Sequence, residues 1–348
     1  MNLFKIKSRN NIIININKPK LQKPIIIKND KLVYYSNFFH RYTGFVYDEK
    51  KKNFIDDFFI TKQLTDWVIK KFLNIQFLNL EFSLPEKIFF LFNFFKKKKI
   101  IQVKDNEIIL FGPWSNIYFH QIYEWLTRIF FIKSKYKIIY LPDHLKKFLS
   151  SKIYKSVFKD VKFKFYSTEK NYIFYNASYL TYIDTRKRNY ALSKTLNKLK
   201  NEISNKFNKL KNNKKYEFIL VSREKASRKI INENELVERL KNYGFKKVLF
   251  EDYSINEQVY ISSQAKIMVG LEGSGLANMI FMKKKSLLIK IANKYVTNSI
   301  FKNVLCKMLE LNYKEFLCKK SFKNLDVICD VDKIEKFIKN YLLIRPNK

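Results

Sequence analysis

Residues 216–291 alternate between short apolar runs and amphipathic runs of about ten residues. The apolar runs predict strands at residues 216–222, 247–250, 266–271 and 286–291. The runs between them predict helices at residues 233–243, which Gly244 ends, and at residues 255–264. Strands that alternate with helices of this length form right-handed βαβ units around a parallel sheet that is covered on both faces. We therefore expect a Rossmann-like domain in the C-terminal half.

The preceding residues predict a second α/β region. An apolar run at residues 107–111 precedes a Gly-Pro turn, after which Ser115 or Asn116 can cap a helix extending to about residue 133. Further strands are predicted at residues 137–141, 161–165 and 178–183, and a lysine-rich helix at residues 192–212. Residues 1–100 contain short aromatic and β-branched runs, at residues 23–27 and 32–35, and a helical pattern at residues 60–73.

A chain of 348 residues has the length of about two domains. We predict an N-terminal α/β domain of residues 1–190, a C-terminal Rossmann-like domain of residues 191–315 and a helical tail of residues 316–348. Hydrophobic residues make up 47% of the chain, which is enough to build a core and excludes a wholly disordered protein.

No apolar run approaches the ~20 residues that a membrane-spanning helix needs. The N-terminus also lacks the continuous apolar stretch of a signal peptide, so we expect a cytoplasmic protein. An aromatic run at residues 89–95 precedes four lysines at residues 96–99, a pattern that suits peripheral binding to an anionic membrane surface. A buried segment that ends in a solvated lysine run would have the same pattern.

The cysteines and histidines are few and widely spaced: Cys306, Cys318, Cys329, His40, His120 and His144. Their number and spacing argue against a disulfide framework and against a zinc site. Asp330 and Asp332 form a D-x-D pattern, which elsewhere holds a divalent metal. Here only a short amphipathic segment follows, and the simpler interpretation is that one of them caps the last helix.

The net charge is strongly positive, because 69 Lys and Arg residues against 31 Asp and Glu residues give 69 − 31 = +38. Such a charge attracts nucleic acid, anionic lipid or phosphorylated substrates. However, only nine of the basic residues are arginines, and lysine rises together with Ile, Asn, Phe and Tyr, whose codons are all A/T-rich. We therefore attribute most of the charge to genome composition and expect no nucleic acid as a partner.

Polar residues gather where the predicted parallel strands end. Ser222 and Arg223 end the first strand, Glu251 ends the second, and the sequence Glu-Gly-Ser-Gly, residues 272–275, ends the third. Ligands of open parallel sheets bind beyond these ends. A glycine turn lets the backbone approach a ligand, a helix near Leu276 would direct N–H groups to it, and Arg223 offers a planar fork for phosphate oxygens. This pattern predicts a nucleoside diphosphate site. The alternative is a glycine turn required only for helix packing.

His120, Glu124 and Arg128 recur every four residues and would share one face of a helix. This face could present a base, a carboxylate that orients it, and an anion-binding group. The alternative is a solvated ladder of charges, but apolar neighbours such as Trp125 and Phe130 favour a buried helix, in which polar groups need a reason. Trp114 is most simply a core residue.

These segments resemble glycosyltransferase family 61. The C-terminal pattern of the family falls here on Ser222, Arg223, Arg228, Asn232, Glu233, Gly244, Phe245, Glu251, Ser254, Glu257, Gln258, Ala265, Gly270, Gly273, Ser274, Gly275, Leu276, Asn278 and Phe281. An upstream pattern falls on Trp114, His120, Glu124 and Arg128. The resemblance covers roughly residues 107–290.

The resemblance implies a GT-B fold with two Rossmann-like domains facing across a cleft, of which residues 1–190 form the acceptor side and residues 191–315 bind a nucleotide-sugar donor. It also implies transfer with inversion to a glycan or glycolipid acceptor. In bacteria such proteins serve capsular or lipopolysaccharide assembly. The implied donor-binding residues are Ser222, Arg223, Arg228, Glu251, Glu272, Gly273, Ser274, Gly275, Leu276 and Asn278.

For catalysis we expect His120 to act as the base, Glu124 to orient it and Arg128 to keep that carboxylate ionised. No cofactor and no metal are expected, because arginines and a helix N-terminus can neutralise a diphosphate. Two departures from the family pattern stand out: Glu272 replaces a histidine, and Asn116 lies one residue early relative to His120. Glu272 would alter the choice of donor or leave a binding or scaffold protein without activity.

Overall fold

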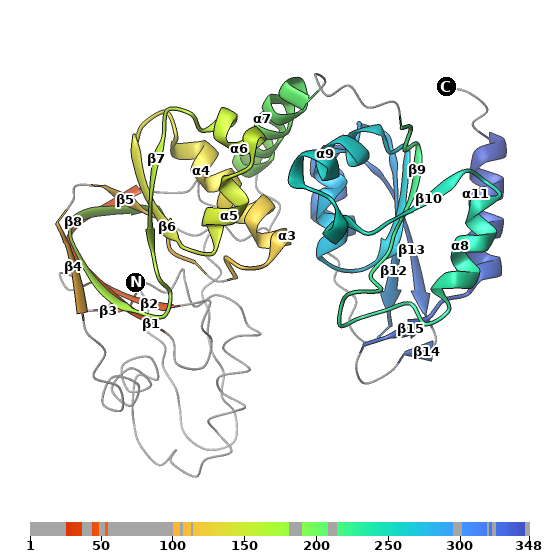
Figure 1. Cartoon of the computed structure of the whole chain (residues 1–348), viewed down its shortest axis with the longest axis horizontal. Helices are drawn as coiled ribbons and strands as arrows, with labels where there is room; N and C mark the ends of the chain where they lie inside the picture. Colours follow the sequence, from red (N-terminus) through yellow and green to blue (C-terminus); the bar gives the residue numbers. More distant parts are fainter. Residues whose placement is uncertain are drawn as a thin grey trace, which may run out of the picture. The chain divides into compact units, whose positions relative to one another are not determined.

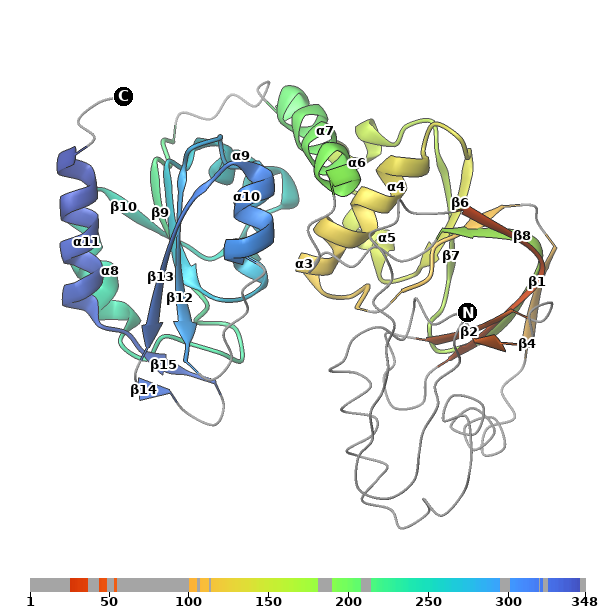
Figure 2. The ribbon, with the colours of Figure 1, turned by 180° about the vertical axis from the view of Figure 1, so that it is seen from behind.

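The computed structural model describes residues 26–36, 44–48, 53–54, 100–104, 107–112, 114–180, 190–207, 214–294, 301–318, 320–321 and 325–344. These residues form two compact units, each with its own β-sheet (Figures 1 and 2). Unit 1 takes its described residues from Met1–Asn116, Phe131–Lys146 and Asp160–Ile183. Unit 2 takes them from Ile117–Phe130, Lys147–Lys159 and Asp184–Lys348. The chain is an α/β protein, as the sequence predicts.

The sheet of unit 1 is mixed. Its order is β3-β2-β1-β8-β5-β6-β7, and β4 pairs with another stretch of β8. The long strand β1 runs antiparallel to β2 and β8, whereas β8, β5, β6 and β7 are parallel to one another. The strands are β1 (Ile26–Ser36), β2 (Gly44–Asp48), β3 (Asn53–Phe54), β4 (Ile100–Lys104), β5 (Ile108–Ile109), β6 (Ile138–Pro142), β7 (Lys162–Tyr166) and β8 (Asn171–Leu180). The parallel part confirms the strands predicted near residues 107, 137 and 161.

Aromatic rings dominate the core of this sheet. The cluster contains Leu32, Tyr34, Val46, Ile109, Phe111, Tyr140, Tyr166, Tyr172, Phe174, Ala177 and Tyr179. Tyr34 stacks on Phe111 with ring centroids 5.8 Å apart. A buried tyrosine needs a partner for its hydroxyl group, and Tyr166 donates to the carbonyl oxygen of Leu110 at 3.0 Å.

A helical segment follows β5 in the chain. It consists of α3 (Tyr118–His120), the π-helical stretch η2 (Gln121–Leu126) and α4 (Thr127–Ile132). The predicted cap is wrong, because Ile117 precedes the first turn and no side chain caps it. The Ser115 hydroxyl instead lies 3.3 Å from Nδ1 of His144. Two short helices, α5 (Leu145–Leu149) and α6 (Lys152–Val157), follow β6.

Unit 2 contains a parallel sheet with the order β10-β9-β11-β12-β13. The strands are β9 (Phe218–Val221), β10 (Phe245–Val248), β11 (Ile267–Leu271), β12 (Leu287–Asn293) and β13 (Asn312–Cys318). The first four confirm the predicted strands, whereas β13 is not predicted, and the predicted boundary at residue 315 lies within it. In this order the connections diverge between β9 and β11, so the neighbouring carboxyl ends of these two strands form the topological switch point.

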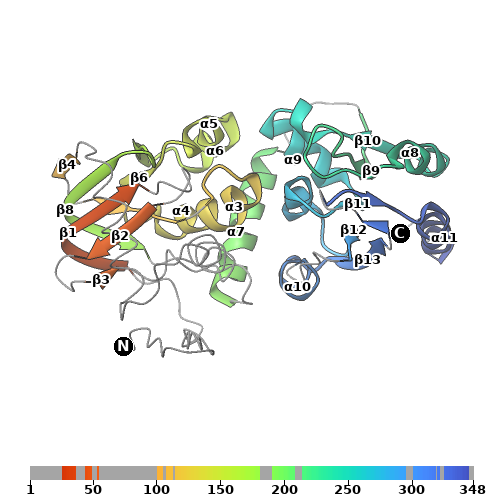
Figure 3. The ribbon, with the colours of Figure 1, turned by 90° about the horizontal axis from the view of Figure 1, so that it is seen from below.

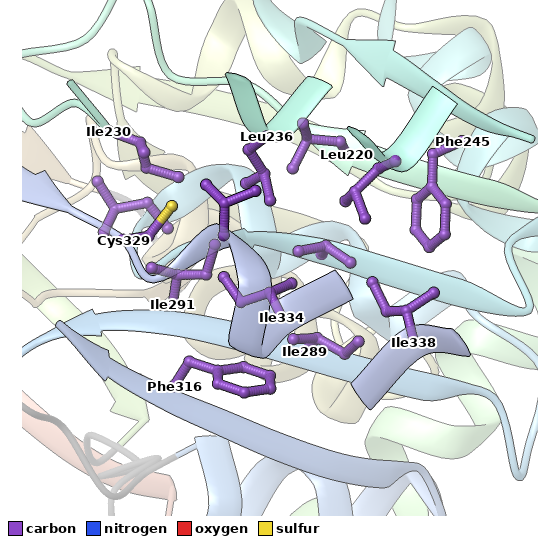
Figure 4. Close-up of a cluster of buried hydrophobic side chains, with 14 of the residues drawn as sticks. Leu220, Ile230, Leu236, Phe245, Ile289, Ile291, Phe316, Cys329, Ile334 and Ile338 are labelled. Carbon is purple, nitrogen blue, oxygen red and sulfur yellow. The ribbon is translucent and has the colours of Figure 1, made fainter. Parts of the chain in front are cut away.

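Helices cover both faces of this sheet (Figure 3). On one face lie α8 (Glu233–Lys241) and α11 (Val331–Ile344), and on the other lie α9 (Ile255–Gln264) and α10 (Cys306–Leu309). The 3-10 helix η4 (Ser274–Phe281) packs against α9. A mainly aliphatic cluster fills the space between the sheet and helices α8 and α11. There Leu236 and Ile334 lie with Ile289 and Ile291 of β12 (Figure 4). The remaining elements are α7 (Tyr190–Phe207), η3 (Phe250–Asp252), η5 (Phe301–Leu305), β14 (Lys320–Ser321) and β15 (Val327–Ile328).

Local signals set several helix ends as predicted. Helix α9 has the predicted bounds, and Ser254 and Glu257 form a reciprocal capping box at its start. Asp330 caps α11, because its Oδ1 accepts a hydrogen bond from the Lys333 amide at 3.0 Å. Among the described residues, no helix has the length and apolarity to cross a membrane. The predicted helix at residues 60–73 and the aromatic and lysine run at residues 89–99 lie outside the described residues.

Candidate active site

The site lies at the switch point of the sheet in unit 2. Strands β9 and β11 are neighbours, and their ends lead into Ser222-Arg223 and Glu272-Gly273 respectively. Parallel strands end at the same edge of a sheet. The sequence therefore predicted correctly that these two segments lie side by side.

Arg223 lies directly against the glycine turn. A Cβ atom built on Gly273 would overlap the Arg223 guanidinium group, so only glycine leaves room for that side chain. Nε of Arg223 donates to the carbonyl oxygen of Arg228 at 3.3 Å. Burial and the nearby charge of Arg228 lower the pKa of Arg223, while Glu251 opposes this effect. Arginine still remains protonated at neutral pH, so the turn carries a fixed positive charge.

The helix after the turn differs from the prediction. It is a 3-10 helix that begins at Ser274, not an α-helix that begins near Leu276. Leu276 is fully buried and packs 3.0 Å from the position of a Cβ built on Gly270, so its role is packing. The first amides of such a helix have no acceptor within the helix. The amides around Ser274 and Gly275, which the sequence predicts beneath the phosphates, therefore belong to the first turn of this helix.

Ser222 links the Arg223 loop to the first turn of α8. It is buried, and its hydroxyl donates to Oε1 of Glu233 at 2.5 Å. Lys247 lies 3.2 Å from the same carboxylate oxygen. The sequence indicates Glu233 only through the family pattern, yet its carboxylate holds this loop through the hydrogen bond from Ser222. An acid in the first turn of a helix that follows a strand end is the signal that could have indicated it.

Asn278 is also engaged within the protein. It is fully buried, accepts a hydrogen bond from the Tyr118 hydroxyl at 2.5 Å and donates to Oε1 of Gln258 at 3.1 Å. Gln258 in turn donates to the carbonyl oxygens of Phe250 and Tyr253, at 2.8 and 3.0 Å. Asn278 thus joins α3, α9 and η4, so its contacts are those of a structural residue.

The predicted pair of His120 and Glu124 is present. Nδ1 of His120 lies 2.8 Å from Oε2 of Glu124, and the two side chains are 19% and 3% exposed. Arg128 is fully buried, stacks on Trp125 at 4.5 Å and donates from Nε to the Glu124 carbonyl oxygen at 3.3 Å. The acceptor of this hydrogen bond from Arg128 is thus the backbone carbonyl of Glu124. The sequence predicted an interaction with the Glu124 carboxylate.

The helix that carries this pair is fixed to η4. Besides the bond from Tyr118 to Asn278, the Tyr123 hydroxyl donates to the Ala277 carbonyl oxygen at 3.0 Å. His120 lies between these two tyrosines in the sequence. Residues 117–130 thus cluster with the C-terminal sheet in unit 2, although they fall within the predicted domain of residues 1–190.

Glu272 forms part of a buried ion cluster. Its Oε2 lies 2.8 Å from Nζ of Lys290, and the same Nζ lies 2.7 Å from Oε1 of Glu315. Lys290 was not singled out by the sequence, because one lysine in a chain so rich in lysine carries no signal of its own. Cys306, Cys318 and Cys329 are buried free thiols. In the part of the chain that is described, no three His, Cys, Asp or Glu side chains are grouped to hold a metal ion.

Comparison with known proteins assigns a family to this site. Residues 118–289 match the family model described as Glycosyltransferase 61. No curated protein matches the chain. The matched range begins at the first residue of α3 and ends in β12, so it contains both the His120 and Glu124 pair and the Arg223 and Gly273 contact. The chain therefore carries a glycosyltransferase family 61 domain, and the enzymes of this family transfer a sugar from a donor to an acceptor.

Proposed function

We propose that the protein is an inverting glycosyltransferase of GT-B type that uses a nucleotide-sugar donor. Its acceptor is a hydroxyl group of a glycan or glycolipid in surface polysaccharide biosynthesis. The observation that carries the proposal is the contact of the Arg223 guanidinium with Gly273 at the switch point. A fixed cation over a glycine turn at this edge suits a diphosphate.

The donor half of the proposed site lies on β9, β11 and η4. The diphosphate would lie against Arg223, with Arg228 next to it and the amides of Ser274 and Gly275 beneath. Because these groups can neutralise the negative charge of a leaving diphosphate, we expect no metal ion to be required. Glu251 lies close enough to oppose the pKa shift of Arg223 and would restrain that side chain before the donor binds.

The acceptor half is the His120 and Glu124 pair. If Nδ1 of His120 donates to Glu124, the tautomer is fixed and Nε2 is left as the proton acceptor. Nε2 would take the proton of the acceptor hydroxyl while its oxygen bonds to the anomeric carbon. The bond from that carbon to the diphosphate breaks at the same time, and its electrons leave with the diphosphate. Substitution from the opposite side inverts the anomeric centre.

A thermal-shift and titration panel of ADP, GDP, UDP and CDP, their common sugar conjugates and a short oligonucleotide tests the proposal. We expect one nucleoside diphosphate to bind and its sugar conjugate to be hydrolysed. Arg223→Ala should weaken that binding by about 10- to 150-fold, since a hydrogen bond to a charged group contributes about 1.5–3 kcal/mol.

Arg239→Ala is the matched control. Arg239 is an exposed arginine of α8 that pairs with Glu335 and Asp332, away from the switch point. The Arg239→Ala variant should bind the nucleotide with the same affinity as the natural protein. Equal affinity of the Arg223→Ala variant and the natural protein would contradict the assignment. Binding only to the oligonucleotide, with strong salt dependence, would favour a nucleic-acid-binding protein instead.

A binding or scaffold protein without catalysis is the second candidate. It is favoured by one observation, the Glu272 and Lys290 ion pair where the family has a histidine. Donor binding without hydrolysis or transfer, under conditions in which the protein is folded, would support this candidate. Hydrolysis of the bound donor would exclude it.

We also propose that the protein binds peripherally to the inner face of a membrane. The support is the aromatic run and lysine cluster at residues 89–99, for which each lysine near anionic lipid contributes ~1 kcal/mol. Flotation with liposomes that contain anionic lipid, but not with neutral liposomes, is the expected result. Flotation that ignores lipid charge would contradict the electrostatic part.

A further inference from the structure

Lys290 and its two carboxylates occupy the face of the sheet that lies opposite the aliphatic cluster. Lys290 stands between Ile289 and Ile291 in β12, and both of these belong to that cluster (Figure 4). Because side chains alternate along a strand, Lys290 points to the other face. Its cross-strand partners are Gly270 in β11 and Glu315 in β13, and Glu272 follows Gly270 by two residues, which keeps it on the same face.

The ammonium group of Lys290 is enclosed. Its side chain is 0% exposed, Nζ contacts both carboxylates at 2.7–2.8 Å, and the Phe301 ring lies 5.5 Å away. Such a buried ion pair contributes little net stability, because the cost of desolvating the charges offsets their attraction. The neighbouring positions of β12 are aliphatic and buried, so an aliphatic residue would fit the sheet at least as well. The cluster therefore calls for a reason other than stability.

The two carboxylates differ in what lies next to them. Oε1 of Glu315 accepts from Lys290 and also from the Tyr313 hydroxyl at 3.0 Å. Glu272 is the residue before Gly273, and its amide donates to the Ile291 carbonyl oxygen at 2.8 Å, which fixes its backbone at the edge. Consecutive Cα atoms are ~3.8 Å apart. The backbone of Glu272 is thus that close to the turn against which Arg223 lies, and its carboxylate, held by Lys290, is still 11% exposed.

A carboxylate at this point determines which part of a ligand can face it. It repels phosphate oxygens, which Arg223 and the amides after Gly273 attract. An ionised carboxylate only accepts hydrogen bonds, so its ligand partner must be a donor. A histidine at the same place can donate, and the exchange reverses the direction of the hydrogen bond. In a nucleotide sugar, the donor groups nearest the diphosphate are the hydroxyls of the ribose and of the transferred sugar.

We propose that Glu272, held by Lys290, accepts a hydrogen bond from such a hydroxyl group and thereby determines which donor is used. The inference rests on the proposed function and adds a specificity-determining residue to it. Lys290 is a positioning residue, because it acts through Glu272 and is itself enclosed. The ribose and the transferred sugar both carry hydroxyl groups that can donate to Glu272. The experiment below distinguishes which of the two does so.

The experiment compares Glu272→Ala with Glu315→Ala, which removes the other carboxylate on the same lysine. The first arm measures binding of the preferred nucleoside diphosphate and of its 2′-deoxy form. If the ribose is the partner, the natural protein and Glu315→Ala prefer the ribonucleotide by at least about 10-fold, whereas Glu272→Ala loses most of this preference. The second arm measures hydrolysis of the nucleotide sugar. If the transferred sugar is the partner, Glu272→Ala raises KM at least about 10-fold, with a smaller change in kcat and unchanged diphosphate affinity.

Glu272→Gln keeps an acceptor oxygen and should restore part of whichever effect is seen. If Glu272→Ala does not fold, Glu272→Leu, which also lacks an acceptor, serves in its place. A merely structural cluster would make the Glu272 and Glu315 variants behave alike. Equal behaviour of the two in both arms therefore overturns the inference. If the diphosphate still binds and Arg223→Ala still weakens that binding, only the role of Glu272 is wrong. If the natural protein binds no nucleoside diphosphate, the proposed function fails with it.

Discussion

Among the described residues of unit 2, two lysines are buried, and their surroundings differ. Lys290, near the carboxyl edge of the sheet, lies between the carboxylates of Glu272 and Glu315. Lys200, in α7, donates to the carbonyl oxygen of Met282 at 2.5 Å and lines a cavity of about 610 Å³ together with Lys283 and Lys284. That cavity lies by the ends of α9 and η4, which lead back to the amino ends of the strands.

The difference has a chemical consequence. Burial, and then the charge of Lys284, lower the pKa of Lys200 to about 8, while Glu310 opposes this shift. Lys200 thus has a pKa well below that of an ordinary lysine. Lys290 lies between two carboxylates, which supply opposite charge. Under the proposed function we expect ligand chemistry at the carboxyl edge, where charged groups are paired, and none at the edge where Lys200 lies. The following predictions test this contrast.

The largest effect is expected at the acceptor half of the site. His120→Ala and Glu124→Gln should each lower kcat by about 100-fold or more, which is typical of the loss of a general base. Nucleoside diphosphate affinity should stay within about twofold of the natural protein. Lys200→Met, at the other edge, is the control and should retain kcat. Full turnover in both acceptor-half variants, or loss of activity on adding a chelator, would contradict the mechanism.

Asn278→Ala should mainly affect stability. It leaves the Tyr118 hydroxyl and the Gln258 amide group without their shared buried partner, and we expect the free energy of unfolding to fall by about 1–3 kcal/mol. Urea denaturation measures this change. Tyr118→Phe removes one of the two bonds and should cost less. A loss of diphosphate affinity without a loss of stability would instead show that Asn278 binds the donor.

Gly273→Ala should weaken nucleoside diphosphate binding by about 10-fold. The new Cβ takes the space of the Arg223 guanidinium, and this flexible side chain must move away from the turn. The double variant with Arg223→Ala is the control, because coupled residues do not have additive effects. In that background Gly273→Ala should cause little further loss. A full additional 10-fold loss would show that the two residues act independently.

The smallest effect concerns pH. The pKa of Lys200 is about 8 in the folded protein, against an ordinary value of 10.5, so the unfolded chain binds more protons between these values. Stability should therefore rise as pH increases through this window. We expect the contribution to stay below about 1 kcal/mol, since solvent at the cavity screens the charge. The Tm of the natural protein minus the Tm of Lys200→Met measures it, and this value should increase with pH. A value that stays constant or falls with rising pH would contradict the assignment.

Features that depend on neighbouring residues were predictable from the sequence. The alternation of residues 216–291 led to the parallel sheet, and Ser254 and Glu257 lie at the predicted start of α9. The four-residue spacing of His120 and Glu124 brought their side chains within 2.8 Å. Periodicity, capping and helix spacing act over a few residues, so a single sequence contains them completely.

Other features depended on residues far apart in the chain. Nothing near Lys290 indicates that its side chain is enclosed, because that follows from the register of β12 with β11 and β13. The sequence predicts Asn278 as a donor-binding residue and gives no sign of its hydrogen bond with Tyr118, which lies 160 residues away in the chain. Sequence alone thus determined most of the elements and which polar residues gather at the carboxyl edge of the C-terminal sheet. Which of those polar residues are buried and hydrogen-bonded to one another was decided by long-range pairing, because burial and hydrogen-bond partners exist only once the strands and helices have packed.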